Sequence, residues 1–563
     1  MRSRIVNALQ GWQEYFSADS NRALTEQFRS IYGDNPGLIT QQQKYYVKML
    51  ARFREFYGGS QESIVIARAP GRVNLVGMHI DHQGGAVNPI AIKETRMVAQ
   101  PRADDQIHLA NCDGDFQPRS FRLSEILPKQ SVDWSSWAQQ LTTQRQRDGI
   151  SVDWADYVKA ALIVLQERER KLAGGYAQNL CGMNLLVDSD LPVAAGLSSS
   201  SALVVATAYA VIACNDLRYE PVWRGDNTIT SDGLIELLGE SERYVGLHGG
   251  IGDHAVIVRA RCGHLSHIQL LPTHVEYAPF PSDYCIVVCH SGITAKKSAG
   301  AQNTYNERVA SYAIGRMLLK KKYSQTVRRV ERFRDFYPES LGISTAELYE
   351  MLKTLPIRAT RAELAEWLPE ERQALDTVYQ SHREESGGYR LRGVCLYGMA
   401  ECERSRRALE FLRQGDIQRF GQLINLSHEG DRVFINGDMP FSPDISDAYL
   451  DGLIRASAEN NSEGMRDLLP EEAELYRQPG GYAASCRELD ALVDTARQVR
   501  GVHGAGLIGA GLGGCISILV KAEAVEELTD TLHNDYYAKY ELPPFVEVCT
   551  PAAGACLLEL ETR

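Results

Sequence analysis

A run of small and hydroxyl residues between Leu191 and Leu203 has the composition of a phosphate-binding loop. Four serines, Ser198–Ser201, follow Gly196 and Leu197, and an apolar run to Ala208 comes directly afterwards. Small residues let the backbone approach an anion, and the unpaired N–H groups of a helix start point towards it. Serine hydroxyls add hydrogen bonds and, with a nucleotide, a magnesium ligand. A serine-capped helix is the simpler alternative, but a cap needs only one serine. The stretch therefore predicts a phosphate loop that opens a helix.

Hydrogen-bonding side chains are also concentrated in residues 72–85, where His79, Asp81, His82 and Gln83 follow a short apolar strand bracketed by glycines. Carboxylate, imidazole and amide groups suit a polyhydroxylated ligand, because together they accept and donate hydrogen bonds. A polar turn is the simpler alternative. A zinc site is a poor one, since adjacent side chains on an extended chain diverge.

A single acid, Asp253, lies in a glycine-rich loop that follows the helix predicted from Leu234 to Val245. A strand-like apolar run, Ala255–Val258, comes next. An isolated loop aspartate is usually a turn residue, but the flanking glycines and the position after the phosphate helix also fit a catalytic acid. The spacing alone leaves both interpretations open.

The glycine-rich run Gly504–Cys515 indicates close approach of the backbone to a ligand or to another loop. It contains a G-x-G-x-x-G match. A dinucleotide-binding fingerprint follows a strand and opens a helix. Here a predicted helix, Ser485–Val499, precedes the match and a predicted strand, Ile516–Val520, follows it. We therefore reject dinucleotide binding.

Composition sets the remaining limits. The 563 residues predict two or three domains. The net charge of -12 excludes a general attraction to nucleic acid or to anionic membranes. No apolar stretch approaches the length of a membrane span, and the N-terminus lacks the apolar core of a signal peptide. Twelve cysteines without zinc-type pairing indicate reduced thiols, so we expect a cytoplasmic protein.

Taken together, the motifs resemble those of the GHMP kinase superfamily, and most closely the galactokinase family. The resemblance runs from about residue 60 to the C-terminus. It is carried by Pro70–Gly77 with His79 and Asp81, by Gly196–Ser200, by Gly250–Asp253, by Gly509–Cys515, and by Tyr305–Arg308 and Ser427–His428.

The resemblance implies an α+β, two-domain GHMP kinase fold with the active site in the cleft between the domains. We expect a helical extension over residues 1–60, an N-terminal kinase domain over 61–290 and a C-terminal kinase domain over 291–563.

The resemblance also implies transfer of the γ-phosphoryl group of ATP to the anomeric hydroxyl of a sugar. Asp253 would be the base or negative partner of that hydroxyl, and Arg72 would lower its pKa and stabilise the transferring group. The other implied contacts are sugar contacts from Met78, His79, Asp81 and Gly250, ATP-phosphate contacts from Gly196, Leu197, Ser198, Ser199, Ser200 and Ser201, third-motif contacts from Gly509, Gly511, Gly513 and Gly514, and a magnesium contact from Ser200.

Two positions depart from the family pattern. Galactokinases usually carry Glu where this chain has Met78, near the C6 hydroxyl of the sugar, and the run from His79 to Gly85 looks more like plant-type galacturonokinases. The family's magnesium-binding Glu falls on Ser241, between Glu240 and Glu242. Either a one-residue shift restores the ligand, for which Glu240 is the candidate, or Ser200 and water hold the Mg²⁺.

The leading hypothesis is an ATP-dependent kinase for galactose or a galactose-configured sugar. Galacturonate and L-arabinose are alternative acceptors. A non-catalytic regulator that binds sugar and ATP is the alternative of another class, and a kinase for a non-sugar alcohol is a third. The expected partners are the sugar and ATP, without nucleic acid or membrane. The sequence leaves the oligomeric state open.

Overall fold

The computed structural model describes residues 6–18, 21–59, 61–173, 179–192, 195–219, 228–246, 251–293, 299–435, 438–459 and 471–560. Within these residues, seven strands form a first sheet in the order β1-β2-β3-β6-β4-β5, with β17 beside β2. The strands are β1 (Asn7–Ala8), β2 (Ser63–Asn74), β3 (Pro89–Pro101), β4 (Gln106–Asn111), β5 (Arg119–Arg122), β6 (Met183–Ser189) and β17 (Cys556–Leu557).

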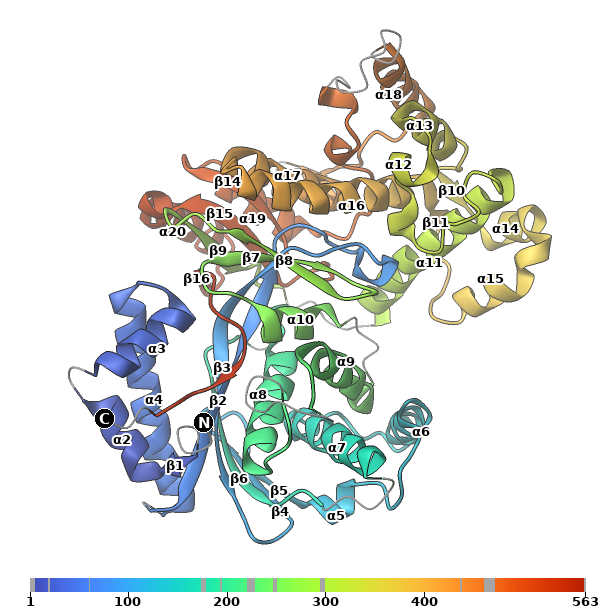
Figure 1. Cartoon of the computed structure of the whole chain (residues 1–563). Helices are drawn as coiled ribbons and strands as arrows, with labels where there is room; N and C mark the ends of the chain where they lie inside the picture. Colours follow the sequence, from blue (N-terminus) through green and yellow to red (C-terminus); the bar gives the residue numbers. More distant parts are fainter. Residues whose placement is uncertain are drawn as a thin grey trace.

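Both faces of this sheet are buried. Side chains alternate across a strand, so Ile64 and Ile66 of β2 face one side while Val65 and Ala67 face the other. The first side packs against α2 (Leu9–Ser17), α3 (Arg22–Tyr32) and α4 (Pro36–Tyr57), drawn in blue in Figure 1. The N-terminal extension is therefore one layer of the first domain, packed on its sheet.

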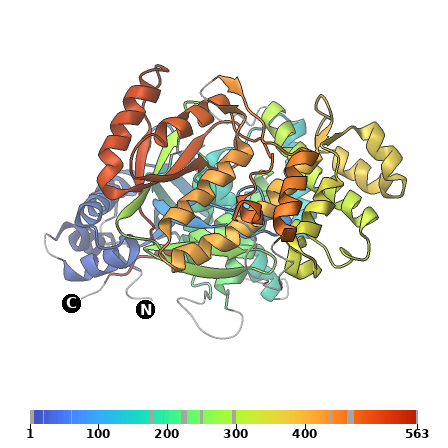
Figure 2. The ribbon, with the colours of Figure 1, turned by 90° about the horizontal axis from the view of Figure 1, so that it is seen from above.

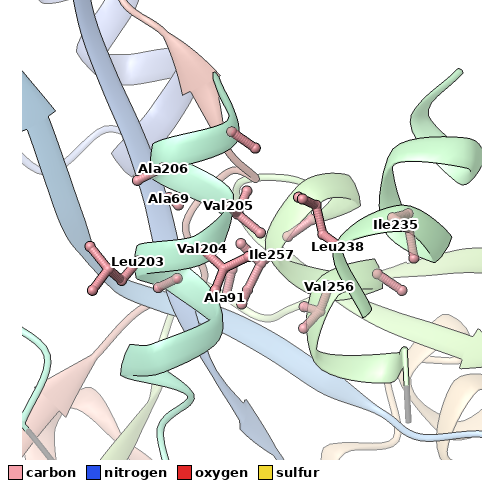
Figure 3. Close-up of a cluster of buried hydrophobic side chains, with 14 of the residues drawn as sticks. Ala69, Ala91, Leu203, Val204, Val205, Ala206, Ile235, Leu238, Val256 and Ile257 are labelled. Atoms are coloured by element: carbon pink, nitrogen blue, oxygen red, sulfur yellow. The ribbon is translucent and has the colours of Figure 1, made fainter. Parts of the chain in front are cut away.

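The run Gly196–Ser201 is called the serine loop below. The opposite face of the sheet is covered by a group of helices, among them the helix predicted to follow the serine loop. That helix, α8 (Ser199–Cys214), is apolar almost all round and is buried between the sheet and its neighbours. Figure 3 shows Val204 and Val205 of α8 near Ala91, Ile257 and Leu238. The surrounding helices are α5 (Leu123–Ile126), α6 (Trp134–Arg147), α7 (Trp154–Leu172), α9 (Ser231–Ser241) and α10 (Gly252–Arg259).

A second sheet has the order β14-β15-β9-β16 and lies with the C-terminal helices. Its strands are β9 (Tyr284–His290), β14 (Val502–Leu507), β15 (Cys515–Lys521) and β16 (Val546–Cys549). The predicted domain boundary at residue 290 is therefore misplaced, because β9 pairs with β15 and β16. The tail after β16 returns to the first sheet as β17, so the first domain also contains the end of the chain. The hairpin of β7 (His264–Gln269) and β8 (His274–Pro279) lies between the two sheets in sequence.

The rest of the C-terminal half is mainly helical. Figure 2 shows α14 and α15 (yellow) at one end of the molecule and the N-terminal helices (blue) at the other. The helices are α11 (Ala299–Lys322), α12 (Pro338–Leu341), α13 (Thr345–Lys353), α14 (Arg361–Trp367), α15 (Arg372–Tyr379), α16 (Leu391–Arg413), α17 (Ile417–Asp431), α18 (Asp447–Glu459), α19 (Arg487–Ala496) and α20 (Val525–Leu532). Short strand pairs are β10 (Arg358–Ala359) with β11 (Tyr389–Arg390), and β12 (Phe434–Ile435) with β13 (Met439–Pro440).

The α+β fold class is confirmed, and most predicted elements are present. One local prediction is wrong: the run Ala255–Val258 forms part of α10, not a strand. Its apolar side chains are buried against α8 and α9, so tertiary packing outweighs the strand preference of Val and Ile. Asp253 therefore lies in the first turn of a helix.

Candidate active site

Arg72 and Asp253 form a bidentate ion pair. The Nε of Arg72 donates to Oδ1 of Asp253 at 2.6 Å, and a terminal guanidinium nitrogen donates to Oδ2 at 2.9 Å. Paired hydrogen bonds of this kind fix both distance and orientation. Arg72 is near the end of β2 and Asp253 is in α10, so the pair joins the sheet to the helix layer. The two residues predicted to carry the chemistry are thus in direct contact.

The pair keeps Asp253 ionised. Burial alone would raise the pKa of this carboxyl, but the charge and hydrogen bonds of Arg72, with a bond from Ser198, hold it below its ordinary value. The Oγ of Ser198 donates to Oδ2 of Asp253 at 2.5 Å. Asp253 is therefore a fixed negative charge at neutral pH, not a group poised to titrate there.

The serine loop lies beside this ion pair at the start of α8. Ser198 has a φ of 58°, and Ser199 is the first residue of the helix. Arg72 holds the loop at two points: its backbone N–H donates to the Leu197 carbonyl at 3.1 Å, and its guanidinium donates to the Gly196 carbonyl at 2.6 Å. A Cβ on Gly71 would lie 2.6 Å from the Leu197 carbonyl oxygen, so the close approach of the two segments requires glycine there.

Two cavities meet at Arg72. The smaller, about 250 Å³, is lined by Arg72, Asn74, Gly77, Met78, His79, Asp81, Val87, Pro89, Glu242, Gly252, Asp253, Tyr305, Gly509 and Ala510. The larger, about 690 Å³, is lined by Arg72, Thr95, Asn111, Asp113, Phe116, Trp154, Tyr157, Val187, Ser189, Leu191, Ala195, Gly196, Leu197, Ser198, Ser199, Ser200, Leu203, Ile508, Gly509, Ala510, Gly511, Gly513 and Gly514. We call them the small and the large cavity.

The third motif is the loop between β14 and β15, and it borders both cavities through Gly509 and Ala510. The first sheet and the helices covering it supply most of the remaining lining, so the cavities lie where the two domains meet. Gly511 has a φ of 78°, and a Cβ there would lie 2.0 Å from the Ala484 carbonyl oxygen. The glycine is thus required by a close backbone contact within the second domain.

The loop after β2, residues 77–83, supplies one wall of the small cavity, and we call it the acceptor loop. Met78 is buried, and its sulfur lies 3.5 Å from the side-chain nitrogen of Asn74. Asp81 lines the cavity, with Nδ1 of His82 at 3.3 Å from its Oδ1. Burial would raise the pKa of Asp81, but its hydrogen bonds and charge interaction with His82 lower it to about 2.

His79, a predicted sugar contact, borders the small cavity, and its imidazole also contacts the second domain. Its ring stacks on Tyr482 with 4.2 Å between centroids, and its Nε2 lies 3.3 Å from Oδ2 of Asp431. The imidazole therefore packs into the second domain, although the residue borders the cavity. In the described part of the chain, no three His, Cys, Asp or Glu side chains gather in an arrangement that could hold a metal ion.

The metal-binding prediction changes at one residue. Glu240 is half exposed, pairs with Arg243 and lines a different surface pocket. Glu242 instead lines the small cavity, and its Oε1 accepts a 2.6 Å hydrogen bond from Ser201. Carboxylate and hydroxyl oxygens suit Mg²⁺, so Glu242 with the serine loop fits that ion and Glu240 does not. Ser200 lines the large cavity, as expected.

The structure does not describe Gly250, so its predicted ligand contact lies outside the described residues. Tyr305 of α11 lines the small cavity, which the sequence indicated only through the resemblance. The buried carboxylates behind the acceptor loop, Glu401 and Asp431, were not found from sequence. The available signal was a pair of opposite charges three residues apart, Glu401 and Arg404, directly after the apolar run Val394–Ala400.

Three family models match the chain. The galactokinase galactose-binding signature matches residues 51–101, the GHMP kinases N terminal domain matches residues 156–261, and the GHMP kinases C terminal model matches residues 453–539. The first contains the acceptor loop and the second contains the serine loop and Asp253. The matched segments thus supply most residues of the two cavities.

Curated relatives match along nearly the whole chain. Galactokinase from Dictyostelium discoideum is 26% identical over 551 residues, covering 92% of this chain and 94% of that protein. Galactokinase from Roseiflexus sp. (strain RS-1) is 26% identical and covers 89% of this chain and 95% of that protein. The crystal structure of Lactococcus lactis galactokinase complexed with galactose has a TM-score of 0.57 at 22% identity, covering 90% of this chain and 98% of that one. That likeness supports the fold.

In the described part of the chain, none of the helices has the length and apolar character needed to cross a membrane.

Proposed function

Because this chain belongs to the galactokinase family of GHMP kinases, we propose that it uses ATP to phosphorylate the anomeric hydroxyl of galactose or of a galactose-configured sugar. The observation that carries the proposal is the Arg72–Asp253 pair at the junction of two cavities. One cavity has the polar lining for a small hydroxylated acceptor. The other has the serine loop and helix start that favour phosphates.

The nucleotide is assigned to the large cavity. Ser198, Ser199 and Ser200 line one part of it, and the aromatic residues Phe116 and Trp154 line another. Aromatic faces stack on nucleobases, while the start of α8 presents unpaired N–H groups to phosphates. Glu242 and the serine hydroxyls would hold Mg²⁺, which neutralises phosphate charge when bound.

Phosphoryl transfer depends mainly on position and charge. In the proposed reaction the acceptor oxygen bonds to the γ-phosphorus, the bond to ADP breaks, and the hydroxyl proton leaves the acceptor. Asp253 orients the hydroxyl and, as a weak base, accepts that proton late in the transfer. Arg72 holds Asp253 and offers positive charge where the phosphoryl group passes.

The acceptor is proposed to lie between Asp81, Tyr305 and Asp253, with Met78 near its C6 side. Among the described residues lining the small cavity, the cationic candidates are Arg72, which binds Asp253, and His79, which faces Asp431. A uronic acid carboxylate therefore has no free cation among them, which supports a neutral sugar as acceptor.

The test is release of ADP from Mg-ATP with galactose, galacturonate, N-acetylgalactosamine, L-arabinose and fucose, with the product identified by ³¹P NMR. We expect turnover with at least one neutral sugar and an anomeric phosphate in the product. Saturable binding of a sugar without turnover of any would favour the regulator instead.

A further inference from the structure

The acceptor loop is fastened to the second domain by a buried carboxylate, Glu401. This residue lies in α16 and is fully buried. Its Oε1 accepts hydrogen bonds from the backbone N–H groups of Gly77 at 2.7 Å and of Met78 at 2.9 Å. These are two successive peptide groups of the loop, so a single oxygen fixes the peptide plane from which the Met78 side chain projects.

The carboxylate is itself held in place. Ser427 of α17 donates to the same Oε1 at 2.9 Å, and Arg404 donates to Oε2 at 2.5 Å. Arg404 in turn donates to the carbonyls of Tyr476 and Gln478. A buried carboxylate that is paired and hydrogen-bonded in this way avoids the large cost of an isolated charge.

The held segment has little conformational freedom. Gly77 has a φ of 93°, and a Cβ at this position would lie 2.4 Å from the Ala86 carbonyl oxygen. The amide of Asn74 donates to the Gly77 carbonyl at 3.1 Å and touches the Met78 sulfur. The next residue, His79, is held against Tyr482 and Asp431 of the second domain. Second-domain residues thus contact three successive residues of the loop.

We propose that Glu401 is a positioning residue that sets the acceptor loop from the opposite domain, so that affinity for the phosphoryl acceptor depends on it. The proposal rests on the proposed function, because it assigns the small cavity to that acceptor. Glu401 does not line either cavity. It acts through the backbone of Gly77 and Met78, and its effect falls on the acceptor and not on ATP.

The chain offers a matched control, Glu403. It is a buried carboxylate on the same helix that pairs with two arginines, Arg406 and Arg407. No hydrogen bond joins it to the acceptor loop among the described contacts. Glu401→Gln and Glu403→Gln therefore each remove one buried negative charge beside arginine, and only the first weakens the charge-assisted bonds to the loop.

The first measurement is amide hydrogen exchange of a peptide covering Val73–Asp81 in the full-length protein without ligands. We expect exchange about tenfold faster in Glu401→Gln than in Glu403→Gln and wild type, because the bonds to Gly77 and Met78 lose their ionic acceptor. If Glu401→Gln does not fold, Glu401→Asp is used, since it keeps the charge but withdraws the oxygen from the loop. Equal exchange in the Glu401 and Glu403 variants would overturn the proposal.

The second measurement is kinetic. With the sugar that wild type turns over, Glu401→Gln should raise the KM for sugar at least about tenfold and leave the KM for ATP within about twofold. Faster exchange with an unchanged KM for sugar would also overturn the proposal. Failure of wild type to turn over any sugar would instead contradict the proposed function, and exchange alone would then decide whether Glu401 positions the loop.

Discussion

Arg72 lines both cavities, so under the proposed function one arginine would serve the acceptor and the nucleotide. It pairs with Asp253 on the acceptor side and binds the Gly196 carbonyl on the phosphate side. Because its guanidinium lowers the pKa of Asp253 against the effect of burial, the carboxylate persists well below neutral pH. We therefore assign Asp253 a role in orientation and charge more than in proton abstraction at neutral pH.

Asp253→Asn tests that role. The amide keeps the shape but loses the charge that orients the acceptor hydroxyl and takes its proton. We expect kcat to fall by about 10²–10⁴-fold while the Kd for ATP changes little. Single-turnover kinetics and calorimetry with ATP measure the two quantities, and activity close to wild type would remove Asp253 from the mechanism. Since the pKa of Asp253 is lowered, wild-type kcat/KM should show no acidic limb from this group near neutrality.

Comparing variants of Glu242 and Glu240 tests which carboxylate binds Mg²⁺. Glu242 lines the small cavity and bonds Ser201, while Glu240 pairs with Arg243 at the surface. Glu242→Gln should raise the Mg²⁺ concentration for half-maximal activity at least about tenfold, and Glu240→Gln should leave it unchanged. Titration of activity with Mg²⁺ at fixed ATP distinguishes them. The opposite ranking would restore the prediction made from sequence.

Met78 tests acceptor preference. Its thioether is a weak hydrogen-bond acceptor, whereas a carboxylate accepts strongly from a hydroxyl. Met78→Glu should shift relative kcat/KM towards galactose over L-arabinose by about tenfold, the value of one hydrogen bond to a charged group. Met78→Gln is the uncharged control. Unchanged ratios across the sugar panel would exclude this side chain from the determination of specificity.

The N-terminal helices contribute polar groups to the sheet as well as apolar cover. Tyr32 of α3 and Tyr46 of α4 donate to the buried carboxylate of Glu94 at 2.7 and 2.8 Å. Glu94 also pairs with Arg68 and Arg96. Arg96 continues to Asp188 and Asp190, directly before the serine loop. The extension is thus linked through fixed charges to the strand that leads into the phosphate site.

Removing one of these donors should lower stability. Tyr46→Phe leaves Glu94 with one bond fewer, and we expect the free energy of unfolding to fall by about 1.5–3 kcal/mol. Tyr45→Phe is the control, because that hydroxyl bonds Gln41 at the surface. Denaturant unfolding at neutral pH measures both variants. An equal effect of the two would show that the buried donor is unimportant.

The same network gives a direction for the pH dependence of stability. Burial alone would raise the pKa of Glu94, but Arg68 and Arg96 lower it. A carboxyl whose pKa is lower in the folded state contributes stability above its unfolded pKa of about 4.3 and loses it as pH falls through the folded value. The loss of unfolding free energy in Tyr46→Phe should therefore reach its maximum at neutral pH, where Glu94 is ionised.

The N-terminal helices and the described part of the C-terminal tail both belong to the first domain (Figure 1). After β16 the tail crosses back, β17 pairs with β2, and Leu558 enters the core between the sheet and the N-terminal helices. Arg68 donates to the carbonyls of Ala553 and Gly554 on the way. The tail thus completes the packed layer between the first sheet and the N-terminal helices.

If the tail is part of the core, shortening its buried side chain should destabilise the whole molecule. Leu558→Ala should lower the free energy of unfolding by about 2–5 kcal/mol, because it leaves a cavity in a fully buried site. Glu559→Ala, next to it and partly exposed, is the control and should change stability by no more than about 0.5 kcal/mol. Thermal unfolding of both measures the difference. A small effect of Leu558→Ala would mean that the tail contributes little to the core.

Several features predicted from the sequence depend only on residues close together in the chain, and the structure contains them. The serines follow Gly196 and open α8, an arrangement that depends only on neighbouring residues of the chain. The glycines between β14 and β15 form a tight loop for the same reason. The fold class followed from motif order together with the family resemblance.

Side-chain direction and distant contacts required the tertiary structure. Residues two apart on a helical turn point to nearly opposite sides, so spacing could not choose Glu242 over Glu240. Likewise His79 turns towards Tyr482, and Gly77 meets Glu401, through packing between segments hundreds of residues apart in sequence.

The sequence by itself determined which chemical groups this protein carries and the loops that hold them, because both depend on residues that are close neighbours in the chain. Only the tertiary structure decided which of these groups share a cavity, where β9 and the tail belong, and what holds the acceptor loop. Those outcomes depend on the burial of apolar faces and the pairing of buried charges between segments far apart in the chain.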